Sequence, residues 1–291
     1  AATNRVRSRP LGNAISVPDL ATLERAADMV LAAETPLIVA GKIGSRPDTF
    51  EVLGDLASDY GLPVTQVGEP ALLSSHPMNL GFTTGQHLPD ADLVLVLESA
   101  VPWIPRNVNP KKSSKIIHLS PDPLYTRFPY RGFEMDLAVV GEPIESLRML
   151  HKILSTRAKG KKRTIAARRK AIKERHEDAF FKRRKTLENA GHTTPIVPPW
   201  VANCVNKVKS DDAILVNELG TNVDHLAHTA PDCYVSGGQA GGLGSSILPR
   251  FILLGSSLAT VKVVELGRVL LVVHAGIQVC SSRHGEEIHD L

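Results

Sequence analysis

The stretch ADLVLVLES (residues 91–99) predicts the fold most directly. Its centre, LVLVL, is apolar at every position, a pattern that is typical of a strand buried on both faces of its sheet. An antiparallel sheet with one face in solvent would instead alternate apolar and polar residues. The stretch therefore favours a parallel sheet that is covered on both sides.

Four further apolar runs indicate strands of the same kind: PLIVAG (36–41), LPVTQV (62–67), SKIIHLS (114–120) and LAVVG (137–141). Between them, helical spacing of apolar residues begins near Pro18, which suits a first turn, and recurs over 49–60 and 142–154. This alternation predicts a doubly wound α/β sheet, whose ligands usually lie at the carboxyl ends of the strands. Those ends carry residues 41–44, 98–99 and 120–123.

A shorter second unit follows. It is predicted to hold a helix over 200–208, strands over 213–218 and 233–235, and the glycine-rich stretch SGGQAGGLGSS (236–246). Such glycines let backbone approach a ligand closely and leave N–H groups free for anions. The stretch matches neither GxxxxGK[ST] nor GxGxxG, so by itself it is equally compatible with a tightly turning loop.

The charge is concentrated in one segment. Residues 157–185 hold 14 basic and three acidic side chains, whereas the whole chain has a net charge of only +4. A run of this kind is either a solvated linker helix or a surface for nucleic acid. The aromatic residues Phe180 and Phe181 are adjacent and do not interleave with the charges, which favours the linker.

Composition places the chain among globular proteins. Its 291 residues are 43% hydrophobic and 22% charged, which excludes a wholly disordered chain. No apolar run approaches the ~18–20 residues of a membrane helix. The three cysteines (Cys204, Cys233 and Cys280) fit neither a disulfide framework nor a CxxC metal site. We therefore expect a reducing, intracellular compartment, cytoplasmic rather than mitochondrial, and no membrane partner.

Six stretches, taken in order, resemble the thiamine-diphosphate-dependent enzymes of the acetolactate synthase, pyruvate decarboxylase and benzaldehyde lyase group. They are TPLIVAGKIG (35–44), HPMNLGF (76–82), DLVLVLESAVPWIP (92–105), KIIHLSPDP (115–123), AILVNELGTN (213–222) and SGGQAGGLG (236–244). The VPWIP element (101–105) resembles an acetolactate-synthase-like subgroup in particular.

The resemblance implies a division of the chain into five segments. They are a lead-in (1–17), the central domain of the family (18–155), a basic linker helix (156–194), part of the diphosphate-binding domain (195–260) and a divergent tail (261–291). The expected fold is a doubly wound parallel sheet followed by a partial second α/β domain.

The resemblance also implies cofactor-binding residues. In the family, the turn after the first strand of the third domain contacts the diphosphate, and Gly220, Thr221 and Asn222 stand there. A glycine followed by a bulky apolar residue supports the bent cofactor, and Gly242-Leu243-Gly244 matches that pattern. Leu243 is equally compatible with ordinary core packing.

Two family features are missing from the sequence. The activating glutamate lies in a pyrimidine-binding domain to which no stretch here corresponds, and the GDG motif of the Mg²⁺ site does not occur. LLGSSLA (253–259) resembles the family helix before that motif, but the sequence diverges from Thr260 onward. We therefore predict no catalytic and no metal-ligating residue here, and a truncated or mis-spliced chain that is inactive by itself.

The resemblance implies thiamine diphosphate and Mg²⁺ as cofactors, a small 2-oxoacid that is decarboxylated or joined to a second carbonyl, and a homo-oligomer in the intact family. Some acetolactate synthase relatives bind FAD in the central domain, and residues 41–44 are compatible with it. Two alternatives from other classes are a non-catalytic nucleotide- or FAD-binding module and a protein that binds nucleic acid through its basic helix.

Five histidines are candidates for acid–base or metal chemistry: His76, His118, His176, His225 and His228. The last two are spaced i, i+3 and would share one face of a helix. No third ligand stands at a recognised spacing for zinc, so structural or surface roles are favoured. Capping or turn chemistry accounts for Glu98 and Asp122, which stand at strand ends.

Overall fold

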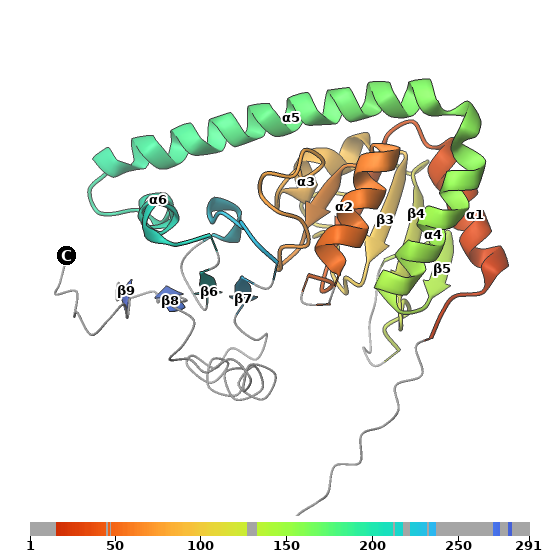
Figure 1. Cartoon of the computed structure of the whole chain (residues 1–291), viewed down its shortest axis with the longest axis horizontal. Helices are drawn as coiled ribbons and strands as arrows, with labels where there is room; N and C mark the ends of the chain where they lie inside the picture. Colours follow the sequence, from red (N-terminus) through yellow and green to blue (C-terminus); the bar gives the residue numbers. More distant parts are fainter. Residues whose placement is uncertain are drawn as a thin grey trace, which may run out of the picture.

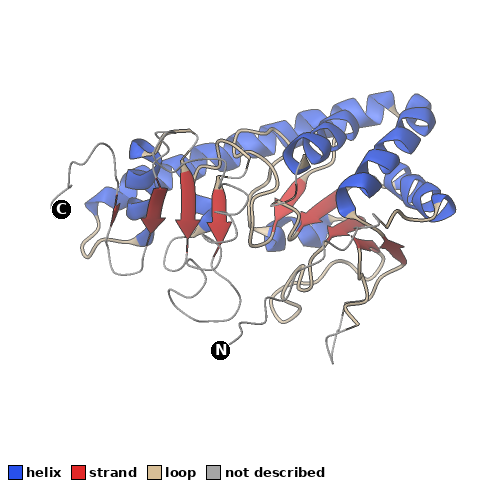
Figure 2. Ribbon diagram, turned by 60° about the horizontal axis from the view of Figure 1, so that its bottom comes forward, coloured by secondary structure: helices blue, strands red, loops and turns tan. Residues whose placement is uncertain are grey.

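The computed structural model describes residues 16–44, 46, 48–126, 133–211, 213–217, 222–231, 233–236, 270–273 and 279–280. Two sheets, one parallel and one mixed, lie along one long helix (Figures 1 and 2). The larger sheet has five strands in the order β2-β1-β3-β4-β5, all parallel. This arrangement confirms the predicted doubly wound α/β class.

The elements of the central sheet closely follow the apolar runs. Its strands are β1 (Pro36–Ala40), β2 (Val64–Gln66), β3 (Leu93–Leu97), β4 (Lys115–Ser120) and β5 (Leu137–Val140). Its helices are α1 (Leu20–Ala32), α2 (Thr49–Tyr60), the short α3 (Thr84–His87) with the 3-10 turn η1 (Leu88–Asp90), and α4 (Pro143–Arg157).

Strand β3 explains why the sheet is buried on both faces. Leu93, Leu95 and Leu97 belong to a large cluster with α1, α2 and α4, whereas Val94 and Val96 belong to a second cluster. That second cluster contains Leu88 and Trp103 and covers the opposite face of the sheet. The uninterrupted LVLVL pattern therefore reflects two apolar environments, one on each side.

Three local expectations need correction. Helix α1 begins after the N-cap Asp19, whose carboxylate accepts the Thr22 N–H at 2.9 Å, so Pro18 lies before the helix and not in its first turn. The β3–β4 and β4–β5 connections have no helix among the described residues. The short α3 was not predicted, because a helix of one turn leaves no periodic pattern.

The basic segment forms α5 (Lys162–Asn189), between the 3-10 turns η2 (Ala158–Gly160) and η3 (Ala190–His192). It runs past both sheets (Figure 1). Ile165 and Ile172 are buried against the central domain, and Leu187 is buried in the core of the second unit. Phe180 and Phe181 are exposed. No helix among the described residues is long and apolar enough to cross a membrane.

The second unit contains α6 (Pro198–Val208), β6 (Ile214–Asn217), the 3-10 turn η4 (Val223–His225), β7 (Tyr234–Ser236), β8 (Leu270–Val273) and β9 (Val279–Cys280). Its strand order is β7-β6-β8-β9, with β6 parallel to both neighbours and β9 antiparallel to β8. Strands β8 and β9 lie within the segment expected to be a divergent tail. That segment therefore contributes to the same sheet as β6.

Candidate functional site

The two units meet at a contact that we call the joint: residues 74–82 of the central domain, Arg183 of α5, and residues 222–228. At one end of the joint, the backbone N–H of Ser74 donates to the carbonyl of His228 at 2.9 Å. The N–H of His228 donates in return to Ser74 Oγ at 2.9 Å. This reciprocal pair joins segments that lie more than 150 residues apart in the chain.

The carboxylate of Asp224 lies at the centre of the joint. Its Oδ1 accepts the backbone N–H of Phe82 at 3.1 Å and Arg183 Nη2 at 3.0 Å. The side chains of Asp224 and Arg183 are only 14% and 22% exposed, so both charges are largely removed from water. Because either charge would be costly without the other, this pair fixes three segments against one another.

Gly81 allows this close approach. Its φ of +78° is strained for any residue with a side chain. A Cβ at this position would lie 2.6 Å from Asp224 Oδ1 and 2.7 Å from Arg183 Nη2. The glycine of HPMNLGF is therefore required both by backbone conformation and by space.

His228 is a buried, neutral side chain of the joint. Burial lowers its pKa to about 4. Its Nε2–H donates to the carbonyl of Val223 at 3.1 Å, and its ring contacts those of Phe82 and Tyr234. His225 ends η4 and His228 lies beyond it, so the predicted shared helix face does not exist. These contacts give His228 a structural role.

Of the six residues predicted to bind the cofactor, Asn222 lies within the described part of the chain. It lies beyond the carboxyl end of β6, and its Oδ1 accepts the N–H of Asp224 at 3.0 Å as the cap of η4. Its exposed amide N–H groups make no hydrogen bond with the described residues, which suits a donor to a phosphate oxygen. Five other predicted residues lie outside the described residues: Gly220, Thr221, Gly242, Leu243 and Gly244.

A second polar cluster lies at the carboxyl edge of the central sheet. Arg46 donates to Glu98 Oε2 through both Nε and Nη2, and to Glu142 Oε1 through Nη1 at 3.1 Å. Burial raises the pKa of Glu98, and the guanidinium of Arg46 opposes that rise. Glu142 also caps α4, because its Oε2 accepts the N–H of Glu145 at 3.0 Å. The cluster thus ties α4 to the loop after β3.

Close backbone packing accounts for the glycines at this edge. A Cβ on Gly41 would lie 2.4 Å from the carbonyl oxygen of Glu98, and one on Gly44 would lie 1.9 Å from that of Pro70. Both positions therefore require glycine whether or not a ligand binds. Residues 41–44 give no independent support to an FAD site.

The remaining candidates make local contacts. His76 bridges Ser58 Oγ at 3.2 Å and the N–H of Met78 at 3.2 Å, and burial lowers its pKa. His176 contacts the carbonyl of Asn79 at 2.7 Å, and the His118 ring is buried beside Tyr125. Asp122 accepts the Thr126 N–H at 3.0 Å in a turn. Within the described part of the chain, no three His, Cys, Asp or Glu side chains could hold one metal ion.

Sequence reasoning missed Arg183, Asp224 and Arg46. Arg183 stands in a run of basic residues, where nothing in the sequence distinguishes the one that is mostly buried from its exposed neighbours. The one usable signal was Gly81, because a glycine within a loop can indicate that another segment closely approaches its backbone.

Comparison with known proteins places these observations in a family. Residues 23–150 match the family model described as the thiamine pyrophosphate enzyme, central domain. Two curated relatives from Clostridium perfringens strains are both named 3D-(3,5/4)-trihydroxycyclohexane-1,2-dione hydrolase. One is 33% identical over 81 residues (25% of this chain, 13% of the relative), and the other is 37% identical over 60 residues (20% and 9%).

Two solved structures share the fold over most of this chain. One is described as a thiamin diphosphate-dependent enzyme from Mycobacterium smegmatis (TM-score 0.61, 18% identity, 91% of this chain). The other is benzoylformate decarboxylase from Polynucleobacter necessarius (TM-score 0.63, 17% identity, 94% of this chain). The chain covers 49% of each of them. Residues 23–150 therefore match the thiamine pyrophosphate enzyme central domain, and most of the chain shares its fold with thiamine-diphosphate-dependent enzymes.

Proposed function

We propose that this chain supplies the central domain and part of the diphosphate-binding domain of a thiamine-diphosphate-dependent enzyme of the acetolactate-synthase-like type. Its substrate would be a small 2-oxoacid, which is decarboxylated or joined to a second carbonyl compound. When bound, thiamine diphosphate supplies the carbon that attacks the carbonyl group, and the protein supplies binding and electrostatics.

The observation that carries the proposal is the joint. The first strand of the second unit, β6, is followed by Asn222, whose amide N–H groups have no partner among the described residues and whose Oδ1 accepts the N–H of Asp224, the partner of Arg183. This pair holds residues 222–228 against the central domain, and so restrains a donor group at the carboxyl end of a parallel sheet. Anionic ligands favour such edges in α/β proteins.

We further propose that the 291-residue chain does not catalyse turnover by itself. The sequence contains no GDG motif, and no stretch resembles the domain that carries the activating glutamate. Asn222 can donate a hydrogen bond to a diphosphate oxygen, but a neutral amide does not replace a divalent cation. Weak binding that is insensitive to Mg²⁺ is the expected behaviour.

Calorimetric titration of the chain tests both parts. We expect thiamine diphosphate to bind more tightly than unphosphorylated thiamine, with or without Mg²⁺, and Asn222→Ala to remove most of that preference. Asn189→Ala, at the end of α5, is the control and should change nothing. Equal binding of the two compounds would contradict the cofactor role. Mg²⁺-dependent turnover of pyruvate by the chain alone would contradict the proposed inactivity.

The curated relatives favour a second candidate. Both are named as hydrolases of a trihydroxylated cyclohexane-1,2-dione, and their identity to this chain is above 30% over the aligned residues. On this proposal the substrate would be a cyclic 1,2-dione that is cleaved by water. Paired assays of a full-length form with pyruvate and with the cyclic dione would distinguish the two, because only one should show thiamine-diphosphate-dependent loss of substrate.

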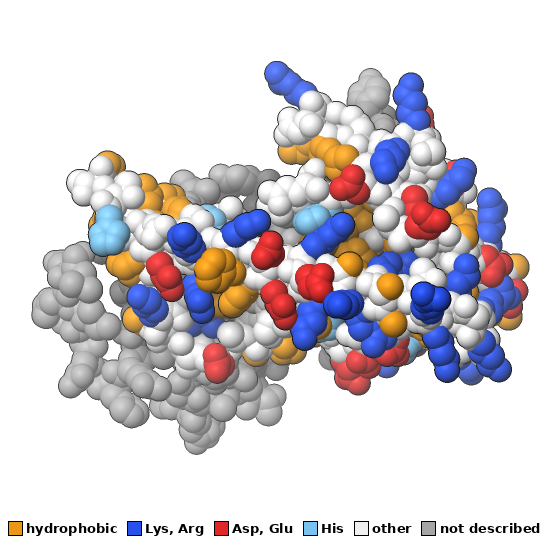
Figure 3. Space-filling view, turned by 90° about the horizontal axis from the view of Figure 1, so that it is seen from above, with side chains coloured by type: hydrophobic (Ala, Val, Ile, Leu, Met, Phe, Trp, Pro, Cys, Tyr) orange, Lys and Arg blue, Asp and Glu red, His pale blue; other side chains and the backbone are white. Residues whose placement is uncertain are grey.

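The contacts of α5 favour the linker interpretation over nucleic-acid binding. Arg168 and Arg169 donate to backbone carbonyls of the central domain, and Arg183 pairs with Asp224. Other cations pair with acidic residues four positions away on the same helix. The face along α5 accordingly shows blue and red side chains intermingled (Figure 3). Salt-sensitive retention on DNA that is lost without residues 157–185 would contradict this interpretation.

A further inference from the structure

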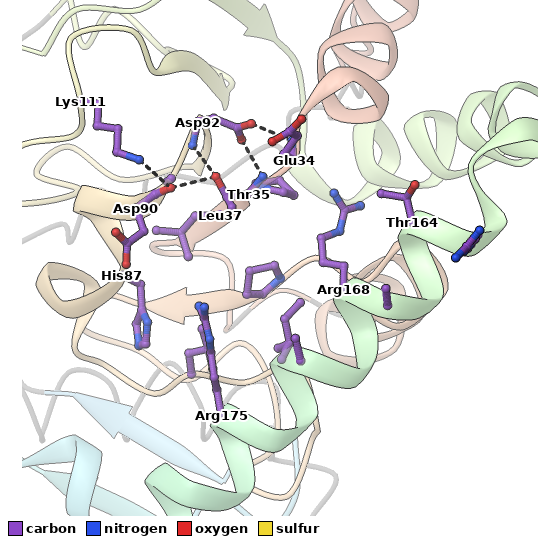
Figure 4. Close-up of a pocket in the computed structure, with 18 residues that line it drawn as sticks. Glu34, Thr35, Leu37, His87, Asp90, Asp92, Lys111, Thr164, Arg168 and Arg175 are labelled. Atoms are coloured by element: carbon purple, nitrogen blue, oxygen red, sulfur yellow. Dashed lines mark hydrogen bonds between the residues drawn. The ribbon is translucent and has the colours of Figure 1, made fainter.

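A cavity of about 930 Å³ lies between α5 and the amino-terminal edge of the central sheet (Figure 4). Its walls come from the start of β1, the turn before β3, and one face of α5. The cluster of Arg46, Glu98 and Glu142 lies at the opposite, carboxyl edge, and of the joint residues only Leu80 lines the cavity. The cavity is therefore separate from the site to which the proposed function is assigned.

The inner wall of the cavity is apolar. Pro36, Leu37 and Pro63 contribute from the sheet, and Ala171 and Ile172 contribute from the helix. Leu37 and Ile172 are almost completely buried. Such a wall suits the ring or short aliphatic body of a small organic molecule.

The helical wall is cationic. Arg163, Arg168 and Arg175 of α5 all line the cavity, and Lys111 lines it from the other side. Arg163 and Arg175 have no ion-pair partner among the described residues. In Figure 4, Arg175 points toward His87, whose pKa is lowered first by burial and then by Arg175. Two guanidinium groups therefore remain available to an anion.

Arg168 has a buried donor that nothing in the described structure satisfies. Its Nη1 donates to the carbonyl of Ala33 at 3.2 Å and its Nη2 to that of Tyr60 at 2.5 Å. Its Nε, which is out of contact with water, has no hydrogen-bond partner within the described ranges. Because water cannot reach this Nε, a ligand oxygen cannot reach it either, so Arg168 adds positive charge to the wall rather than a hydrogen bond to a ligand.

The acidic residues of the cavity offset this wall only in part, chiefly through Asp92, whose charge opposes the lowering of the pKa of Arg168 by burial. The carboxylate of Asp92 accepts the N–H groups of Glu34 and Thr35 at 2.7 and 2.9 Å, so it serves the backbone. Lys111 Nζ contacts the backbone carbonyl of Asp90, not its carboxylate. Glu34 and Asp90 are exposed, as are Arg163 and Arg175, so solvent screens the charges of both signs at the mouth of the cavity.

We propose that this cavity binds a small organic anion, with its phosphate or carboxylate group against Arg175 and its apolar body against Leu37, Pro63 and Ile172. Guanidinium groups bind both anions in two-point geometry, so both share the chemistry that the cavity offers. Such a ligand would hold α5 onto the sheet. Since α5 also carries Arg183 of the joint, occupancy would stabilise the placement of the second unit.

The test is calorimetric titration of the 291-residue chain with four probes: phenyl phosphate, benzoate, inorganic phosphate and benzyl alcohol. We expect phenyl phosphate, benzoate or both to bind at least ten times more tightly than inorganic phosphate and benzyl alcohol. A preference for the first identifies a phosphate ligand, and a preference for the second identifies a carboxylate. Absence of binding, or inorganic phosphate binding as tightly as phenyl phosphate, would overturn the proposal.

Substitutions of arginine residues on α5 test whether the ligand binds in this cavity. Arg175→Gln removes an exposed guanidinium that has no structural partner in the described residues, so the fold should persist and binding should weaken about tenfold. Arg184→Gln changes a cation of α5 that is outside the cavity and should leave binding unchanged. Equal weakening by both variants would mean that the ligand responds only to helix charge, which would also overturn the proposal. Arg163→Gln, about 18 Å from Arg175 along α5, should weaken binding less than Arg175→Gln.

Discussion

The central sheet is packed largely by its own helices, whereas the core of the second unit depends on α5. In the central domain, α1, α2 and α4 cover one face of five strands, and Leu88 and Trp103 cover the other. The described core of the second unit is formed by Leu187 of α5, Ala202 and Val205 of α6, Leu215 of β6, and Leu226. Helix α5 adds Ile165 and Ile172 to the large core of the central sheet and Leu187 to the small core of the second unit, so the smaller core depends on α5 for a larger share of its residues.

The largest expected effect comes from core truncation, and it should differ between the two units. Leu97→Ala in β3 should lower the free energy of unfolding of the central domain by about 3–5 kcal/mol, because the side chain is fully buried among well-packed neighbours. Leu215→Ala in β6 should cost about 2 kcal/mol, since a smaller cluster relaxes around the gap more easily.

Urea unfolding measures the first loss through Trp103 fluorescence in a Trp200→Phe background, because the chain has only these two tryptophans. Hydrogen exchange of the β6 amides measures the second. Equal losses in the two units would contradict the comparison and would indicate that they share one cooperative core.

Gly81→Ala should break the contact between the two units. The left-handed backbone and the approach to Asp224 and Arg183 together should cost about 2–3 kcal/mol. Gly68→Ala is a matched control, because Gly68 has a φ of +83° but open space around its Cβ, and it should cost only about 1 kcal/mol. Limited proteolysis should detect release of residues 222–228 in the first variant alone. If both substitutions cost the same, the contact contributes nothing beyond backbone strain.

The pattern of apolar residues was enough to predict the central domain, and the reason is physical. The side chains of a strand such as LVLVL are all removed from water only when an apolar layer packs on each face of the sheet. The sequence of the strand therefore predicts that both faces are covered. Helix α2, predicted over 49–60, forms over Thr49–Tyr60 because its apolar spacing ends at Gly61, whose φ of +58° closes the helix.

The joint could not be predicted in the same way. Its contacts pair single residues such as Ser74 and Asp224 with partners more than 40 positions away, and polar residues carry no periodic signal that identifies a partner. Asn222 was predicted through family resemblance alone. Its second role, as cap of η4, follows from its side chain and could have been inferred from the Asn-x-Asp spacing.

Acidification should weaken the joint through His228, and burial of His87 gives the central domain a pH dependence of the same sign. The pKa of His228 is about 4 in the folded chain and near 6.5 when unfolded, so the unfolded state binds the proton more readily between these values. Stability is therefore complete above pH 6.5 and falls on acidification toward pH 4, by roughly 1.4 kcal/mol per pH unit at most. His228→Gln, which keeps a donor for the carbonyl of Val223, should flatten the dependence of unfolding free energy on pH between 7 and 5. An unchanged slope would contradict the buried, neutral state of this histidine.

The smallest predicted changes in the free energy of unfolding come from two neighbouring cations of α5, and they should differ in size. Lys182 forms an exposed pair with Asp178 at 3.7 Å, and Lys182→Gln should change the free energy of unfolding by less than about 0.5 kcal/mol. Arg183 holds Asp224 across the joint, so Arg183→Gln leaves a mostly buried carboxylate without its cation and should cost about 1–2 kcal/mol. Urea unfolding in low and high salt checks both, since the exposed pair alone should respond to screening. If the two substitutions have equal effects, then α5 acts on the second unit through Leu187 and apolar packing rather than through charge.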